Sequence, residues 1–158
     1  MTLGCEDWWV TSTSGLMGVG YEGATPEEVL KELNGRGVTT LVDVRLNPIS
    51  RKKGFSKKSL SEFLAANGVQ YLHAPALGNP RDNREAYAEV GTDDGNAARA
   101  RYRQLLKESP AAEALQDLAA LAETSSIAVF CYEQSELRCH RHEVLRAARD
   151  LIEAPSQR

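Results

Sequence analysis

The sequence predicts an α/β fold, with one domain built on a mainly parallel sheet and helices on both faces. Apolar, β-branched runs typical of buried parallel strands occur at 38–44 and 126–132. Segments with helical periodicity alternate with strand-like runs along the chain, which is the pattern of such folds. No internal repeat or linker divides the 158 residues, a length that suits one domain with a sizeable core.

The first half of the chain predicts three strands and two helices. Thr25, Pro26 and Glu28 combine an N-cap residue, a proline in the first turn and an acid three residues after the cap. This capping-box pattern starts a helix that we expect to end near Gly35 and Gly37. The other elements of this half are predicted as strands at 16–21, 38–44 and 69–73 and a helix at 56–66.

The second half predicts a long loop followed by three helices and a strand. Residues 74–96 are rich in proline, glycine, asparagine and charge, which predicts a functional or mobile loop. Helices are expected at 97–108, 110–123 and 139–152, and the fourth strand at 126–132. Residues 1–15 lack periodicity and predict a peripheral extension to the domain at 16–152, and residues 153–158 predict a frayed tail.

Composition limits the classes of function. A hydrophobic content of 42% with 26% charged residues is that of an ordinary globular protein, and the net charge of −3 gives no general attraction to nucleic acid. No segment approaches the roughly 20 apolar residues that cross a bilayer, so we expect no membrane partner and no signal peptide. Three cysteines do not suggest a disulfide framework, which predicts a reduced, cytoplasmic protein. The oligomeric state is not determined by the sequence.

Two groups of polar residues follow the predicted second strand. Asp43 and Arg45 point to the same face where the strand ends, as either a structural ion pair or part of a site. A basic loop, which we define as residues 45–58, carries Arg51 and contains no acid, and it therefore suits phosphate, a nucleotide or a nucleic-acid backbone. Charge runs of this kind are also common on solvated surfaces.

A third group lies at the end of the predicted third strand and beyond it. Tyr71 ends this strand together with His73, and Arg84 follows a turn shaped by glycine, proline and asparagine. The Arg84 guanidinium could bind a carboxylate or a phosphate with two parallel hydrogen bonds. Ion pairs with Asp82 or Glu85 are the structural alternative.

The fourth group contains the sulfur chemistry and consists of Cys131, Glu133, Cys139, His140 and Arg141. A cysteine near a helix N-terminus, beside arginine or histidine, is favoured as a thiolate, so we expect Cys139 to be the more reactive thiol and Cys131 the more buried. Either cysteine could be a nucleophile. The spacing of these residues matches no common zinc finger, and we therefore expect no metal and no other cofactor.

Because the carboxyl ends of parallel strands meet at one edge of a sheet, these groups should form one site. We expect Arg45, Arg84 and Arg141 to bind an anion, with further contacts from Arg51 and Tyr71. Asp43 or Glu133 would serve as general base. His140 is a further candidate catalytic residue.

Eight short motifs give the chain a resemblance to a known family. They are Tyr21-Glu-Gly23, Val42-Asp-Val-Arg45, Asn47-Pro-Ile-Ser-Arg51, Lys53-Gly-Phe-Ser-Lys57, Gly68-Val-Gln-Tyr71, Leu77-Gly-Asn-Pro80, Cys131-Tyr-Glu133 and Cys139-His-Arg141. Their order resembles that in domain-of-unknown-function family 488 (DUF488), from about residue 16 to residue 152. The resemblance implies an α/β fold and a clustering of these residues, and it implies no substrate.

A more distant likeness is to the rhodanese and cysteine-phosphatase architecture, which places a catalytic cysteine after a late strand. Here Arg138 lies seven positions after Cys131, one more than the phosphatase spacing, and the intervening segment contains Glu133 and Glu136 but no glycine. The sequence thus predicts an enzyme or binder of an anionic ligand, phosphate-bearing or related to nucleic acid. The alternatives are a non-catalytic module that binds nucleic acid or protein, and sulfur transfer or redox chemistry on Cys131 or Cys139.

Overall fold

The computed structural model describes residues 15–154, and its centre is a sheet of four parallel strands in the order β1-β4-β2-β3. Strand β1 (Leu16–Gly20) pairs with β4 (Ile127–Cys131), β4 pairs with β2 (Thr40–Asp43), and β2 pairs with β3 (Gln70–His73). The predicted parallel α/β fold is confirmed, and the four predicted strand regions are neighbours in one sheet.

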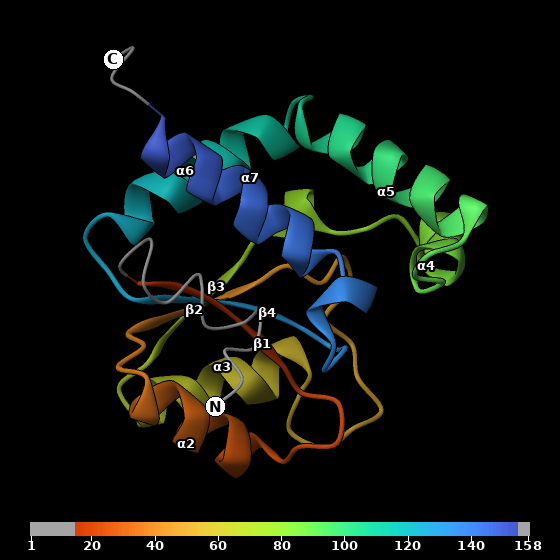
Figure 1. Cartoon of the computed structure of the whole chain (residues 1–158). Helices are drawn as coiled ribbons and strands as arrows, with labels where there is room; N and C mark the ends of the chain where they lie inside the picture. Colours follow the sequence, from red (N-terminus) through yellow and green to blue (C-terminus); the bar gives the residue numbers. More distant parts are fainter. Residues whose placement is uncertain (1–14, 155–158) are drawn as a thin grey trace, which may run out of the picture.

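Helices cover both faces of this sheet (Figure 1). The helices are α2 (Pro26–Gly35), α3 (Lys57–Ala66), α4 (Arg81–Tyr87), α5 (Asp93–Leu106), α6 (Ala111–Ala122) and α7 (Arg141–Glu153), with short 3-10 turns η2 (Pro75–Leu77) and η3 (Glu136–Arg138). Helices α2 and α3 pack on one face, and α6 and α7 lie over the other (Figure 1). No helix among the described residues is long and apolar enough to span a membrane.

Alternation along the central strands divides the core into two layers. Leu41 and Phe130 pack towards α2 and α3, whereas Val42 and Val129 pack towards α5, α6 and α7. Every residue of β2 and β4 is buried, as strands covered on both faces require. The same alternation directs the Cys131 side chain to the α5–α7 layer.

The predicted helix starts agree with the structure where a capping signal is present. Thr25 and Glu28 form both hydrogen bonds of a capping box at the start of α2. In the second half, the helix predicted at 97–108 begins earlier, at Asp93, because the Thr92 side chain caps it by accepting a hydrogen bond from the Gly95 amide.

The sequence predicts a functional or mobile loop at 74–96, but most of the segment has regular secondary structure. The segment contains η2, helix α4 and the first turn of α5. Helix α4 has seven residues, which is too short for a clear periodicity, and its packing against α5 stabilises it. The Asn83 side chain on α4 donates hydrogen bonds to Asn79 and to the Ala98 carbonyl, which are contacts that no local sequence pattern reveals.

The extension predicted at 1–15 and the tail predicted at 153–158 lie almost wholly outside the described residues. The cytoplasmic location stays a prediction.

Glycines in β1 allow the segment that follows β4 to cross this strand at close range. A Cβ atom at Gly20 would collide with the Glu133 carbonyl and would lie 3.1 Å from the Arg141 guanidinium. A Cβ atom at Gly18 would collide with the Glu136 side chain. The position of residues 133–136 therefore depends on the absence of side chains at two positions of the neighbouring strand.

We predict that Gly20→Ala lowers the free energy of unfolding by about 1–3 kcal/mol, because the added methyl group overpacks a filled space. Urea denaturation followed by circular dichroism measures the change. Gly35→Ala is the control: its Cβ would meet nothing within 4 Å, and alanine in a helix is favoured over glycine by roughly 0.5–1 kcal/mol. Equal effects of the two changes would contradict the close approach.

Candidate functional site

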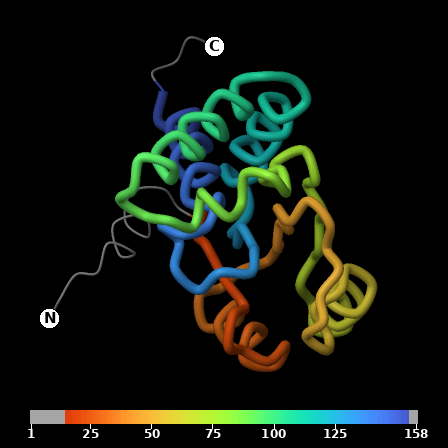
Figure 2. The backbone as a smooth tube through the Cα atoms, turned by 90° about the vertical axis from the view of Figure 1, so that its right-hand side faces the viewer, coloured from red at the N-terminus to blue at the C-terminus, as the bar shows by residue number. Residues whose placement is uncertain are grey.

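The carboxyl ends of the four strands meet at one edge of the sheet, and the segments that follow them surround a cleft. Figure 2 looks onto this side of the molecule, where the segment after β2, the segment around α4 and the segment after β4 come together. Because β4 lies between β1 and β2, Cys131 at its end is flanked by the ends of both strands. Ligands in such folds bind at this kind of edge.

Asp43 and Arg45 form a buried, two-pronged ion pair beneath the cleft. Arg45 Nε lies 2.9 Å from Asp43 Oδ1, and Arg45 Nη2 lies 2.7 Å from Oδ2. The Tyr71 hydroxyl also donates to Oδ2, and the Arg45 amide donates to Oδ1. Both carboxylate oxygens are thus occupied, and Asp43 is fully buried.

The Arg45 guanidinium is held on its other side as well. Its Nη1 donates to the Phe55 carbonyl at 2.7 Å and to the Tyr21 hydroxyl at 3.1 Å, and its carbon lies 5.2–5.3 Å from the rings of Phe130 and Tyr21. Burial alone would lower the pKa of Arg45, but the hydrogen bonds and charge of Asp43 outweigh it and raise this pKa. Burial and the Asp43 hydrogen bond raise the pKa of Tyr71. The contacts make the pair part of the framework of the site.

Cys131, Cys139 and His140 form a compact cluster on the α7 side of the sheet edge. The His140 Nδ1 atom lies 3.9 Å from Cys131 Sγ and 3.8 Å from Cys139 Sγ. His140 Nε2 lies 2.9 Å from the Val44 carbonyl, to which it donates, and the Arg141 amide donates to Cys139 Sγ. All three side chains are buried, and both cysteines are free thiols.

The expected order of burial of the two thiols is wrong. Cys139 is 1% exposed and Cys131 is 5% exposed, and of the two only Cys131 lines the cleft. Cys139 is deeper because it precedes α7 as the chain turns back under this helix, whereas Cys131 ends its strand at the open edge. Their relative reactivity stays a prediction.

The cluster favours a separation of charge between Cys139 and His140. The hydrogen bond to Cys139 and burial raise the pKa of Cys131. Burial opposes ionisation of Cys139, but the Cys131 hydrogen bond and the charges of His140 and Arg141 lower its pKa. Burial likewise opposes protonation of His140, and the Cys139 charge outweighs it and raises the pKa of this histidine. These opposite pKa shifts favour the thiolate form at Cys139 over that at Cys131.

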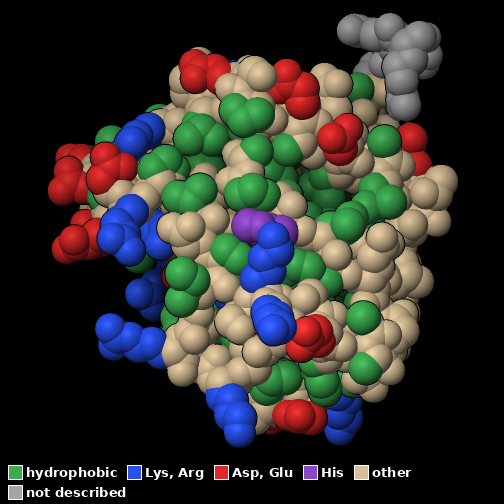
Figure 3. Space-filling model, turned by 180° about the vertical axis from the view of Figure 1, so that it is seen from behind, with side chains coloured by type: hydrophobic (Ala, Val, Ile, Leu, Met, Phe, Trp, Pro, Cys, Tyr) green, Lys and Arg blue, Asp and Glu red, His purple; other side chains and the backbone are tan. Residues whose placement is uncertain are grey.

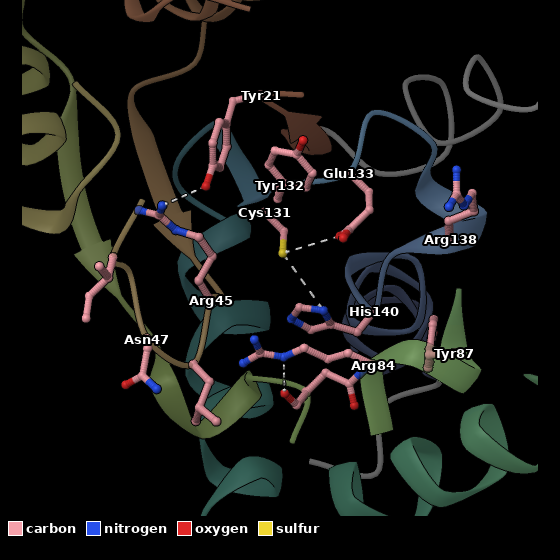
Figure 4. A pocket seen from close by; sticks show the side chains of 13 residues that line it. Tyr21, Arg45, Asn47, Arg84, Tyr87, Cys131, Tyr132, Glu133, Arg138 and His140 are labelled. Atoms are coloured by element: carbon pink, nitrogen blue, oxygen red, sulfur yellow. Dashed lines mark hydrogen bonds between the residues drawn. The ribbon is translucent and has the colours of Figure 1, made fainter. Parts of the chain in front are cut away.

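Glu133 lies next to this cluster on the cleft side. Its Oε1 atom lies 4.0 Å from Cys131 Sγ (Figure 4). Burial and the charge of Cys139 raise the pKa of Glu133 to about 7. A carboxyl group with such a pKa can give or take a proton near neutral pH.

Arg141 holds the segment after β4 and does not reach the cleft. Its guanidinium donates to the carbonyls of Glu133 and Gln134, and its Nε lies 3.9 Å from the Glu136 carboxylate. The side chain is 1% exposed. The sequence grouped Arg141 with the anion-binding arginines, but these contacts give it the task of positioning the Glu133 backbone.

The cleft has a volume of about 260 Å³. Its lining combines Arg45, Cys131, Glu133 and His140 with the exposed arginines Arg84 and Arg138 (Figure 4). Arg84 Nε donates to the Asn79 carbonyl, which directs the side chain along the cleft wall. One small cavity thus joins a thiol, a carboxyl group, an imidazole and three arginine side chains, two of which are exposed.

Several predicted site residues lie apart from this cleft. Asp43 and Tyr71 belong to the network beneath it, Cys139 and Arg141 lie behind its wall, and Arg51 is exposed in the basic loop. On the face shown in Figure 3, lysine and arginine side chains are interspersed with uncharged and acidic side chains. The roles proposed for these residues stay predictions.

Sequence reasoning did not select Tyr21, Asn79, Tyr87 and Arg138 as site residues, although all four line the cleft. Tyr21 directly follows β1. Because ligands bind at the carboxyl ends of parallel strands, its position in the sequence could have identified it as a site residue. Asn79 and Tyr87 come from the segment expected to be a loop, and only the packing of α4 brings them to the site.

We predict that Arg45→Leu destabilises the protein by about 3–5 kcal/mol, because it leaves the buried Asp43 carboxylate without its partner. Arg101→Leu is the control, since its ion pair with Asp82 is half-exposed and should be worth no more than about 1 kcal/mol. Urea denaturation of both variants gives the comparison. Similar losses would show that the Asp43–Arg45 pair does not support the fold.

Comparison with known proteins adds the family. The family model described as Domain of unknown function DUF488 matches residues 25–148. This range includes Asp43 and Arg45 at the end of β2, Cys131 and Glu133 at the end of β4, and Cys139 and His140 before α7. The comparisons with curated proteins and with solved structures found no match. The match covers most of the chain, and the protein belongs to the DUF488 family.

Proposed function

We propose that the protein is an enzyme that acts on a small anionic molecule, phosphate-bearing or of similar charge, bound in the cleft at the carboxyl edge of the sheet. The observation that carries this proposal is the cleft lining itself. Cys131, Glu133 and His140 face the same cavity as two exposed arginines, Arg84 and Arg138. Reactive groups and anion-binding groups in one concave site are the general mark of an active site.

The two arginines are suited to bind the anion. Arg45 has its guanidinium occupied by Asp43, Tyr21 and Phe55, and Arg141 is buried. Arg84 and Arg138 are exposed at the cleft, so a ligand can reach their donors. Guanidinium groups bind carboxylate and phosphate oxygens in a bidentate manner. A cavity of about 260 Å³ favours a small ligand over a polymer.

Glu133 is suited to proton transfer in this reaction. Its pKa of about 7 provides both protonation states at neutral pH, and its carboxyl group lies beside Cys131. Asp43 is a poor candidate for the base, because both of its oxygens accept hydrogen bonds within the buried network. We therefore assign the general acid–base role to Glu133.

A non-catalytic module that binds nucleic acid is a second candidate. The observation in its favour is the set of exposed basic side chains in the basic loop, namely Arg51, Lys53, Lys57 and Lys58. In that case the affinity for single-stranded DNA would fall steeply with salt and would depend on these residues. Sulfur transfer by Cys131 and Cys139 would instead use the cleft and would require Cys131.

We predict that phosphate, sulfate or adenosine monophosphate raises the melting temperature, and that Arg84→Ala/Arg138→Ala abolishes the rise. A ligand at 100 times its Kd stabilises the folded state by about 2.7 kcal/mol, which a thermal-shift assay detects. Lys107→Ala/Arg146→Ala removes the same charge from a different hollow and should leave the rise unchanged.

An equal loss in both double variants would show a general charge effect and would contradict a specific anion site. If no anion in this set stabilises the protein while single-stranded DNA binds through Lys57 and Lys58, the second candidate replaces the first.

A further inference from the structure

Three metal-binding atoms from two separate elements converge at the inner end of the cleft. Cys131 is the last residue of β4, and Cys139 and His140 directly precede α7. Cys131 Sγ, Cys139 Sγ and a ring nitrogen of His140 all lie within 4.8 Å of one another. The catalytic assignment of Glu133 and the anion-binding arginines does not explain why two thiols meet one imidazole here.

The separations suit a common centre. Zinc bonds of about 2.3 Å to sulfur and about 2.05 Å to nitrogen, at tetrahedral angles, place ligand atoms roughly 3.6–3.8 Å apart. His140 Nδ1 lies 3.9 Å from one sulfur and 3.8 Å from the other. These two separations exceed the tetrahedral values by only a few tenths of an ångström, and the two sulfur atoms lie within 4.8 Å of each other.

The surrounding groups orient these atoms as outer partners of a metal do. His140 Nε2 carries the proton that it donates to the Val44 carbonyl at 2.9 Å, so the lone pair of neutral His140 is on Nδ1, which faces the sulfurs. The Arg141 amide donates to Cys139 Sγ at 3.5 Å. The edge of the His140 ring packs against Tyr102, with 5.4 Å between ring centroids. The ring is thus fixed in a ligating orientation.

We propose that Cys131, Cys139 and His140 bind a thiophilic divalent cation, Zn²⁺, with its fourth coordination position directed to the cleft. Thiolate and imidazole ligands select zinc over magnesium or calcium. Two thiolates would balance the charge of the ion. Three protein ligands with a fourth position open to a ligand are the pattern of catalytic zinc sites.

The sequence argued against zinc because the spacing of these residues matches no finger. That argument applies to zinc fingers, in which short turns present closely spaced ligands. Here a strand end supplies one ligand and the approach to a helix supplies two, and the seven residues between the cysteines include the η3 turn. The tertiary fold, rather than a local motif, brings the ligands together.

A catalytic role of the zinc ion rests on the proposed function, whereas the binding of the ion by Cys131, Cys139 and His140 does not. An anion held by Arg84 and Arg138 would lie beside the fourth position. A water molecule bound there would transfer a proton to the Glu133 carboxylate and leave a hydroxide on the metal. Glu133 is the carboxyl group nearest to Cys131, with 4.0 Å between its Oε1 and the sulfur.

The test uses the full-length protein, stripped with a chelator under reducing conditions and titrated with Co²⁺. We expect one equivalent to bind, with the thiolate-to-cobalt charge-transfer band and the intense visible bands of tetrahedral cobalt, and Zn²⁺ to displace it. Cys131→Ser, Cys139→Ser and His140→Gln should each weaken binding by more than about 100-fold, since loss of an outer partner alone weakens metal binding roughly 10–100-fold. His142→Gln is the matched control and should bind as the unaltered protein does.

A second measurement on the unaltered protein remains decisive if a variant does not fold. Zn²⁺ should slow alkylation of Cys131 and Cys139 by iodoacetamide at least 10-fold, measured by peptide mass spectrometry, whereas Mg²⁺ should not. A cobalt spectrum without the thiolate band, or alkylation unaffected by Zn²⁺, would overturn the proposal. Arg84→Ala/Arg138→Ala should keep the cobalt spectrum, so failure of the anion site and failure of the metal site are distinguishable.

Discussion

The position of β4 between β1 and β2 is the constraint on which the rest of the site depends. Strands β1, β2 and β3 precede β4 in the sequence, but β4 lies between β1 and β2 in the sheet. The Tyr21 amide donates to the Cys131 carbonyl at the end of β4, and the Glu22 amide donates to the Tyr132 carbonyl. On the other side the Val44 amide donates to the Phe130 carbonyl, so the register is fixed on both sides of β4. Cys131 therefore emerges between the segments that carry Tyr21 and Arg45. A change in this strand order would separate the sulfur chemistry from the Asp43–Arg45 network.

Buried arginines secure the segments that leave the sheet. Arg45 connects β2, through Asp43, to Tyr21 and to the Phe55 carbonyl in the following loop. Arg141 connects the start of α7 to the carbonyls of Glu133 and Gln134. A charge buried with its partners resists displacement, because separating them would leave an uncompensated charge in a medium of low dielectric constant. Rigid strand ends suit a site whose reactive groups must keep their mutual positions.

The cluster of two thiols, an imidazole and a carboxyl group is electrostatically demanding when buried. Its members influence one another: Cys139 raises the pKa of both His140 and Glu133, and Cys131 stabilises the Cys139 thiolate. Protein cores seldom collect such groups without a function, because burial of polar groups costs free energy that apolar side chains would not.

The sequence alone determined the α/β class, the parallel sheet and the four strand regions, because apolar periodicity and capping residues are local signals. Strand-end chemistry also pointed to Asp43, Arg45, Cys131 and Glu133 at one edge, since parallel strands must present their carboxyl ends together. Only the tertiary structure decided which of these residues face the cleft. Burial and hydrogen-bond partners assigned Asp43, Arg45 and Arg141 to the framework and placed Arg84 and Arg138 at the surface of the cavity. Helix α4 depends on contacts with residues outside it, such as the hydrogen bond from Asn83 to the Ala98 carbonyl, and periodicity and spacing carry no information about such contacts.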